Sequence, residues 1–188
     1  DAIVPAAQEL AQQDVGAIMV IGTSLTFYRG YEAHQQLLDR LRAETGLPVS
    51  TMTEAVVEGL RSVGAKRIAV ATAYSDLVND RLADFLRRSG FDVLSMKGFG
   101  LTGFGDAGNK SEQDIIDLGS QAIEAAQGAD GVLISCGGLK TLGCAVPLEQ
   151  RYGIPVVTST QSAFWKAMRL AGESGFIPDR GRMLAQAA

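Results

Sequence analysis

The sequence predicts an α/β protein with parallel sheets, and two observations carry this prediction. Short apolar runs rich in β-branched residues alternate along the chain with longer segments whose apolar residues recur at helical spacing. Such runs are typical of strands buried on both faces, and their alternation with helices is typical of α/β folds. With 188 residues, the chain can form one sizeable core or two small linked ones.

The two patterns can be assigned to residue ranges. The expected strands are Ala17–Ile21, Val49–Ser50, Arg67–Ala71, Asp92–Ser95, Gly131–Ser135 and Ile154–Thr158. The expected helices are Ile3–Gln13, His34–Glu44, Thr53–Val63 with Thr53 as N-cap, Val78–Ser89, Glu112–Ala126 and Ser162–Leu170. A helix therefore comes first, where α/β domains commonly open with a strand. The tail from Gly172 to Ala188 is expected to be a loop with a frayed end.

Composition excludes several classes of function. The net charge is −4 and the basic residues are scattered, which argues against nucleic acid or an anionic membrane as partner. No apolar run approaches the roughly 20 residues of a membrane span, and no signal peptide is visible. Cys136 and Cys144 are too few and too close for a disulfide framework, so we expect a cytoplasmic protein. One histidine and two cysteines also leave little for a transition-metal site, so no metal is expected.

Small hydroxyl residues and glycines follow four of the expected strands. These junctions are Gly22-Thr23-Ser24, Thr72-Ala73-Tyr74-Ser75, Ser135-Cys136-Gly137-Gly138 and Thr158-Ser159-Thr160. Ligands of open parallel sheets bind at the carboxyl ends of strands, and free backbone N–H groups at helix N-termini suit an anion. Gly, Ser and Thr are also ordinary loop and cap residues, but their recurrence at four junctions favours an anion site.

Cys136 is the residue in these junctions best suited to chemistry. It ends an apolar strand and precedes two glycines, which permit a tight turn and close approach of backbone to a ligand. At the N-terminus of a following helix its thiolate would be stabilised, and it could act as acid or base. A buried structural cysteine is the open alternative. Cys144 lacks this setting and is expected to serve packing.

The other candidates are hydroxyl groups. Thr23 and Ser24, after the unobstructed backbone of Gly22, can hold a carboxylate by several hydrogen bonds. Tyr74 could add a phenol donor, or it could be an amphipathic side chain at the edge of the core. His34 lies on a helix and is expected to be solvated. A Ser-His-Asp triad is not expected, because no serine sits in a nucleophile elbow and His34 lies away from any strand end.

Nucleotide-binding motifs are missing from the sequence. It has neither a Gly-x-x-x-x-Gly-Lys-Thr phosphate loop nor a strand-associated Gly-x-Gly-x-x-Gly followed by a helix. The glycines within residues 99–105 are instead expected to form a mobile loop over the site.

Three segments carry a family resemblance: Gly22-Thr23-Ser24-Leu25-Thr26-Phe27-Tyr28-Arg29-Gly30, Ala71-Thr72-Ala73-Tyr74 and Leu133-Ile134-Ser135-Cys136-Gly137-Gly138-Leu139. They resemble the arylmalonate decarboxylase family of the aspartate/glutamate/hydantoin racemase superfamily, and the likeness covers nearly the whole chain. The resemblance implies two pseudo-symmetric α/β domains with the active site in the cleft between them. Residues 65–159 would form one domain. Residues 1–64 and 160–188 would form the other, with its first strand region apparently missing.

The resemblance also implies a reaction. Racemases of the superfamily carry two cysteines on opposite sides of a planar intermediate, and the position matching the first is Gly22 here. Cys136 would then protonate from one face only, which suits an enantioselective decarboxylase. No metal, biotin or thiamine is needed on this mechanism, so no cofactor is expected.

The implied substrate is a disubstituted malonate. Thr23, Ser24 and Tyr74, with the N–H groups of Cys136 and Gly137, would hold one carboxylate in a dioxyanion hole. The other would leave as CO2 from an apolar pocket, giving an enediolate. Phe104 and Ala107 would line that pocket. The alternatives are a racemase or isomerase of the same superfamily, of the maleate isomerase or hydantoin racemase type, and a non-catalytic carboxylate-binding homologue.

Overall fold

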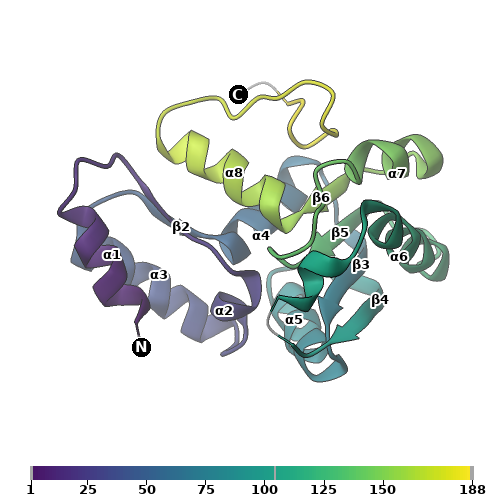
Figure 1. The fold of residues 1–188 in the computed structure, drawn as a ribbon, viewed down its shortest axis with the longest axis horizontal. Helices are drawn as coiled ribbons and strands as arrows, with labels where there is room; N and C mark the ends of the chain where they lie inside the picture. The colour runs from purple at the N-terminus through teal and green to yellow at the C-terminus, as the bar shows by residue number, and fades with distance from the viewer. Residues whose placement is uncertain (1, 104, 187–188) are drawn as a thin grey trace.

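The strands of the chain form two parallel sheets in the computed structural model, which describes residues 2–103 and 105–186 (Figure 1). The smaller sheet pairs β1 (Ile18–Val20) with β2 (Val49–Thr51). The larger has the order β4-β3-β5-β6, with every neighbouring pair parallel. Its strands are β3 (Arg67–Tyr74), β4 (Asp92–Leu101), β5 (Gly131–Ser135) and β6 (Val156–Thr158). The predicted α/β class with parallel sheets is confirmed.

Helices separate most of the strands along the chain. They are α1 (Ile3–Ala11), α2 (Thr23–Phe27), α3 (Tyr31–Thr45), α4 (Met52–Ser62), α5 (Asp76–Arg88), α6 (Glu112–Ala125), α7 (Ala145–Tyr152) and α8 (Ser159–Leu170), with a 3-10 turn η1 at Asp106–Asn109. Within the described residues, none of these helices has both the length and the hydropathy needed to cross a bilayer.

The central strand β3 buries both of its faces. Ile68 and Val70 belong to a core cluster that includes Phe85 of α5. Ala69 and Ala71, which point the other way, belong to a second cluster with Ile115 of α6. Because side chains alternate across a strand, this sheet is covered by helices on both faces (Figure 1).

The smaller sheet has its own apolar cluster. Val4 and Ala7 of α1 pack with Leu41 of α3 and with Ile18 and Val49 of the two strands. All five side chains are at most 4% exposed. The opening helix is therefore an integral part of this layer.

The C-terminal tail corrects one expectation. Met183 and Leu184 are each only 1% exposed and belong to the same core cluster as α4 and α5 side chains. The N–H of Ile177 donates to the Leu184 carbonyl over 2.8 Å. The expected loop is present, but the expected fraying is wrong for residues 172–186, because these two apolar side chains anchor the segment.

Other differences concern the bounds of elements. β4 continues to Leu101, although its glycines had predicted that the loop begins at residue 99. A Cβ on Gly98 would lie 2.7 Å from the Tyr74 carbonyl, so this glycine permits close packing within a strand. Phe104 lies outside the described residues.

The helices also differ from the prediction. The cap of α4 is Thr51 rather than Thr53, since the Thr51 hydroxyl accepts from Glu54 N–H. Helices α2 and α7 were not predicted.

Candidate active site

The carboxyl ends of four strands supply the site. Thr23 begins α2 shortly after β1, Tyr74 is the last residue of β3, Cys136 follows β5, and Ser159 begins α8 directly after β6. Consecutive positions are 51, 62 and 23 residues apart in sequence. The strands β3, β5 and β6 are parallel members of one sheet, so their carboxyl ends lie at the same edge, and Thr23 reaches that edge from the two-stranded sheet.

Three hydrogen bonds connect the residues. Thr23 Oγ1 donates to Ser159 Oγ over 3.0 Å, and the backbone N–H of Cys136 donates to the same oxygen over 3.4 Å. Ser159 Oγ in turn donates to Ser135 Oγ over 3.5 Å. The structure therefore places the threonine of one predicted junction beside the cysteine of another, with a serine between them that the sequence had not singled out.

Tyr74 adds a phenol to this cluster. Burial, and next the neighbouring Cys136, raise the pKa of Tyr74 above its ordinary value, while hydrogen bonding to Ser135 and Thr23 opposes the rise. Its ring is 9% exposed and packs edge-on against Phe27, with centroids 5.8 Å apart. Tyr74 therefore stays protonated and can donate, and it is also part of the core edge, so the two interpretations of this residue are compatible.

Cys136 is half-buried and has an unusual backbone. Its φ is +149°, a conformation that residues with a side chain rarely adopt. Strained residues of this kind cluster at functional sites. The expected helix directly after Cys136 is wrong, because α7 begins only at Ala145 and the intervening residues form turns. The helix end beside Cys136 is instead that of α8, through Ser159.

The glycines of the site are closely surrounded. Gly22, the N-cap of α2, has φ +119°, which glycine adopts without steric cost. A Cβ on Gly137 would lie 3.1 Å from Met52 Sδ, and one on Gly138 would lie 3.2 Å from Ala107 Cβ. Ala107 of η1 therefore lies against the turn that follows Cys136.

Thr23 is held from its backbone as well as its side chain. Thr53 Oγ1 donates to the Thr23 carbonyl over 2.9 Å and lies 2.7 Å from Thr26 Oγ1. Thr23 is 2% exposed. Ser24, the next residue, is half-buried at the second position of α2. Of the two hydroxyls at this junction, that of Thr23 is fixed and that of Ser24 is more accessible.

His34 is not solvated, which corrects the expectation for this residue. It is 2% exposed, its Nε2 lies 2.8 Å from Thr51 Oγ1, and its ring stands edge-on to Phe85. Burial lowers its pKa below the ordinary 6.5. Its helix turns it toward the core rather than toward solvent.

The packing role of Cys144 is supported, since it is fully buried and burial raises its pKa to about 12.

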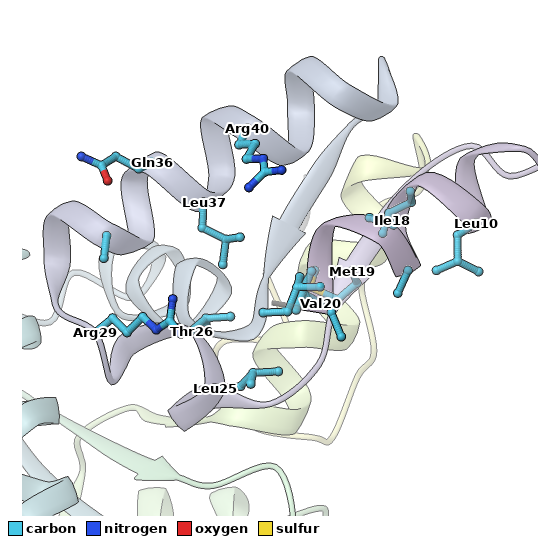
Figure 2. Close-up of a pocket in the computed structure, with 15 residues that line it drawn as sticks. Leu10, Ile18, Met19, Val20, Leu25, Thr26, Arg29, Gln36, Leu37 and Arg40 are labelled. Atoms are coloured by element: carbon cyan, nitrogen blue, oxygen red, sulfur yellow. The ribbon is translucent and has the colours of Figure 1, made fainter.

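A cavity of about 760 Å³ lies elsewhere, over β1 and between α1 and α3 (Figure 2). Its lining is mainly apolar, including Leu10, Leu25 and Leu37, with Arg29 and Arg40 among the polar contributors. None of the predicted site residues that the structure describes lines it. This cavity is therefore separate from the cluster around Cys136.

Comparison with known proteins identifies the family. The family model described as arylmalonate decarboxylase matches residues 1–184. The chain belongs to the arylmalonate decarboxylase family. It is 42% identical over 172 residues to the arylmalonate decarboxylase of Bordetella bronchiseptica, covering 92% of this chain and 72% of that one. The chain is accordingly an enzyme of the arylmalonate decarboxylase type, a carboxy-lyase.

Solved structures extend the comparison. A double mutant of arylmalonate decarboxylase in a liganded form superposes with a TM-score of 0.95 at 40% identity, over 98% of this chain and 79% of that chain. The maleate isomerase Iso of Pseudomonas putida S16 superposes with a TM-score of 0.90 at 20% identity, over 100% of this chain and 77% of that one. The second match shows a shared fold.

Proposed function

We propose that this arylmalonate decarboxylase family member decarboxylates disubstituted arylmalonates enantioselectively, through an enediolate that Cys136 protonates. The observation that carries the proposal is the convergence of Thr23, Tyr74 and Cys136 through one buried hydroxyl cluster. Hydroxyl and phenol donors suit a carboxylate, and a thiol beside them can supply a proton.

The residues would have separate roles. Thr23, Ser24 and Tyr74 donate to the retained carboxylate, and the N–H of Gly137 completes the dioxyanion hole. The Cys136 N–H, which was expected to join them, already donates to Ser159. The proposal therefore assigns that N–H to holding the backbone of Cys136.

The reaction would proceed in two steps. The bond between the α-carbon and the departing carboxylate breaks, CO2 leaves, and the electron pair moves onto the retained carboxylate as an enediolate. Donors aimed at those oxygens stabilise the growing charge, each worth a few kcal/mol. The Cys136 S–H then transfers its proton to the α-carbon, and the thiolate is reprotonated from solvent.

Stereoselectivity would follow from Gly22. A glycine offers no acid on the face opposite Cys136, so protonation comes from one side. In the liganded double mutant of arylmalonate decarboxylase a glycine is replaced by cysteine and a cysteine by serine, and the spacing of those two positions equals that of Gly22 and Cys136. This agreement supports the pairing of the two positions across one site.

The domain arrangement belongs to the same proposal. Residues 65–159 would form one α/β domain, which contains the whole four-stranded sheet. Residues 1–64 with 160–188 would form the other, which contains β1 and β2. The site would lie between them, with Thr23 from one domain and Tyr74 and Cys136 from the other.

The test is turnover of methylphenylmalonate, followed by CO2 release and by the enantiomeric excess of the product. Cys136→Ser is expected to lower kcat by about 10²- to 10⁴-fold, the range for loss of a positioned acid. Cys144→Ser is the matched control and should keep kcat, because the buried Cys144 thiol contacts the carbonyls of Glu112 and Lys140 rather than the hydroxyl cluster. A Cys136→Ser rate within about twofold of wild type would rule out this role.

An isomerase is the second candidate, because maleate isomerases share the fold and one from Geobacillus stearothermophilus is 22% identical over 157 residues. Formation of fumarate from maleate, without CO2 release from malonates, would favour it. Thermal shifts with malonates and no turnover of either substrate would instead favour a non-catalytic carboxylate binder.

A further inference from the structure

One buried hydroxyl of the site has no part in the reaction proposed above. Ser159 is fully buried at the first position of α8. Its Oγ contacts the hydroxyl of Thr23, the backbone N–H of Cys136 and the hydroxyl of Ser135. Ser159 therefore touches both the residue assigned to the carboxylate and the residue assigned to the proton.

Helix capping does not explain this serine. The cap of α8 is Thr158, whose Oγ1 accepts from Gln161 N–H over 3.3 Å. The Ser159 hydroxyl does not cap the helix and points into the site instead. Its presence in a fully buried position calls for hydrogen-bond partners, and all of those it has belong to the site.

A count of protons shows what Ser159 can do. Each hydroxyl has a single proton to donate. Thr23 donates its proton to Ser159 over 3.0 Å, so it cannot also donate to a carboxylate. If the Ser159 hydroxyl rotates and donates to Thr23 Oγ1 instead, Thr23 is free to donate to the substrate.

We propose that Ser159 is a positioning residue for decarboxylation, which reverses its hydrogen bond with Thr23 when a carboxylate binds. Donation from Ser159 then polarises the Thr23 hydroxyl, and this effect grows as negative charge builds on the retained carboxylate. The inference rests on the proposed function, because it needs Thr23 to bind the substrate.

The second contact of Ser159 supports the same role. Its Oγ accepts from Cys136 N–H, and Cys136 has the strained φ of +149°. A strained backbone persists only where its surroundings hold it. Ser159 therefore positions the proton donor as well as the carboxylate donor.

The test compares Ser159→Ala with Ser162→Ala. Ser162 is a matched control on the same helix, because it is also fully buried but donates to the Thr158 carbonyl over 2.8 Å. With methylphenylmalonate, Ser159→Ala is expected to lower kcat by about tenfold and to change KM by less than about threefold. Ser162→Ala should keep both values. Ser159→Thr, which retains the hydroxyl, should recover most of kcat.

A double-mutant cycle adds a readout that a loss of packing would not produce. In a Thr23→Val background, Ser159→Ala should lower kcat by a smaller factor than in the wild type, because one of the two residues through which it acts is already changed. Equal kcat values for Ser159→Ala and Ser162→Ala, or losses that multiply in the double variant, would overturn the inference. Wild-type protein that releases no CO2 would instead overturn the proposed function itself.

Discussion

A Cβ on Gly137 would lie only 3.1 Å from Sδ of Met52, so Met52 occupies the space into which a side chain at position 137 would point. Met52 is 2% exposed at the start of α4, and its packing limits how far it can move aside. Close contact between these two residues explains why glycine follows Cys136, and it places α4 against the turn that carries the proposed N–H donor.

Gly137→Ala is therefore expected to lower kcat/KM by about tenfold or more. The turn must shift away from Met52, and the backbone N–H of residue 137, the proposed donor, moves with it. Gly16→Ala is the control, since a Cβ there would meet nothing within 4 Å. Steady-state kinetics with methylphenylmalonate check both variants. Equal kcat/KM for the two would show that the position of this turn does not matter.

The two cysteines should differ in reactivity. Cys136 is half-buried, whereas Cys144 is fully buried and burial raises its pKa to about 12, which leaves it as a poorly nucleophilic thiol. Treatment of native protein with iodoacetamide should label Cys136 and abolish decarboxylation. Peptide mass spectrometry identifies the site. Labelling of Cys144 at the same rate as Cys136 would contradict the observed burial.

Much of the site could be predicted from the sequence because its residues sit at strand ends. The strand periodicity placed Gly22, Thr23, Tyr74 and Cys136 at junctions, and parallel pairing of β3 with β5 brings the junctions of Tyr74 and Cys136 to one edge. Ser159 was only one of several hydroxyls at its junction. Its role depends on distances to Thr23 and Cys136, which no local pattern contains.

The misassigned elements share a physical cause, which is tertiary packing. The short helix α7 was not predicted, and it contains Pro147 in its first turn, where proline is tolerated. Gly100 suggested a loop but lies in β4, close to Gly98, which permits close approach to the Tyr74 carbonyl. His34, on a helix between Ala33 and Gln35, was expected to be solvated, yet Phe85, distant in sequence, packs against its ring.

Gly22→Cys tests the proposed geometry of the two faces. The substitution should slow decarboxylation and introduce exchange of the α-proton of 2-arylpropionates with solvent deuterium, since a second thiol would face the α-carbon. It should also cost about 1–3 kcal/mol of stability, because φ at this position is +119°. Mass spectrometry of the recovered acid and a thermal melt are the measurements. No exchange in a folded variant would place Gly22 away from the α-carbon.

The tail provides a test of the fold. Leu184→Ala should lower the free energy of unfolding by about 2–5 kcal/mol, since Leu184 is 1% exposed within the main core cluster. Chemical denaturation measures the change. Phe176→Ala is the control in the same segment, because its side chain is 47% exposed. Similar, small effects of both substitutions would mean that the tail is not anchored in solution.

The single histidine predicts a pH dependence of stability. Burial of His34, opposed in part by Glu54 and assisted by Arg42, lowers its pKa below 6.5 in the folded protein. Below pH 6.5 the unfolded chain therefore binds a proton that the folded chain resists, so folding becomes weaker as pH falls from about 6.5 toward the lowered pKa. Above about pH 6.5 both states are neutral at this residue, and its contribution is constant.

Melting temperatures between about pH 7.5 and pH 5 should accordingly fall in wild-type protein, and fall less in His34→Gln, which has no proton to gain in this range. Carboxylates change little here, because most titrate below about pH 5. The hydrogen bond between His34 Nε2 and Thr51 Oγ1 makes the stability of the fold sensitive to protonation of His34, since Thr51 also caps α4. Parallel melting curves for the two proteins across this range would assign the acid sensitivity to other groups.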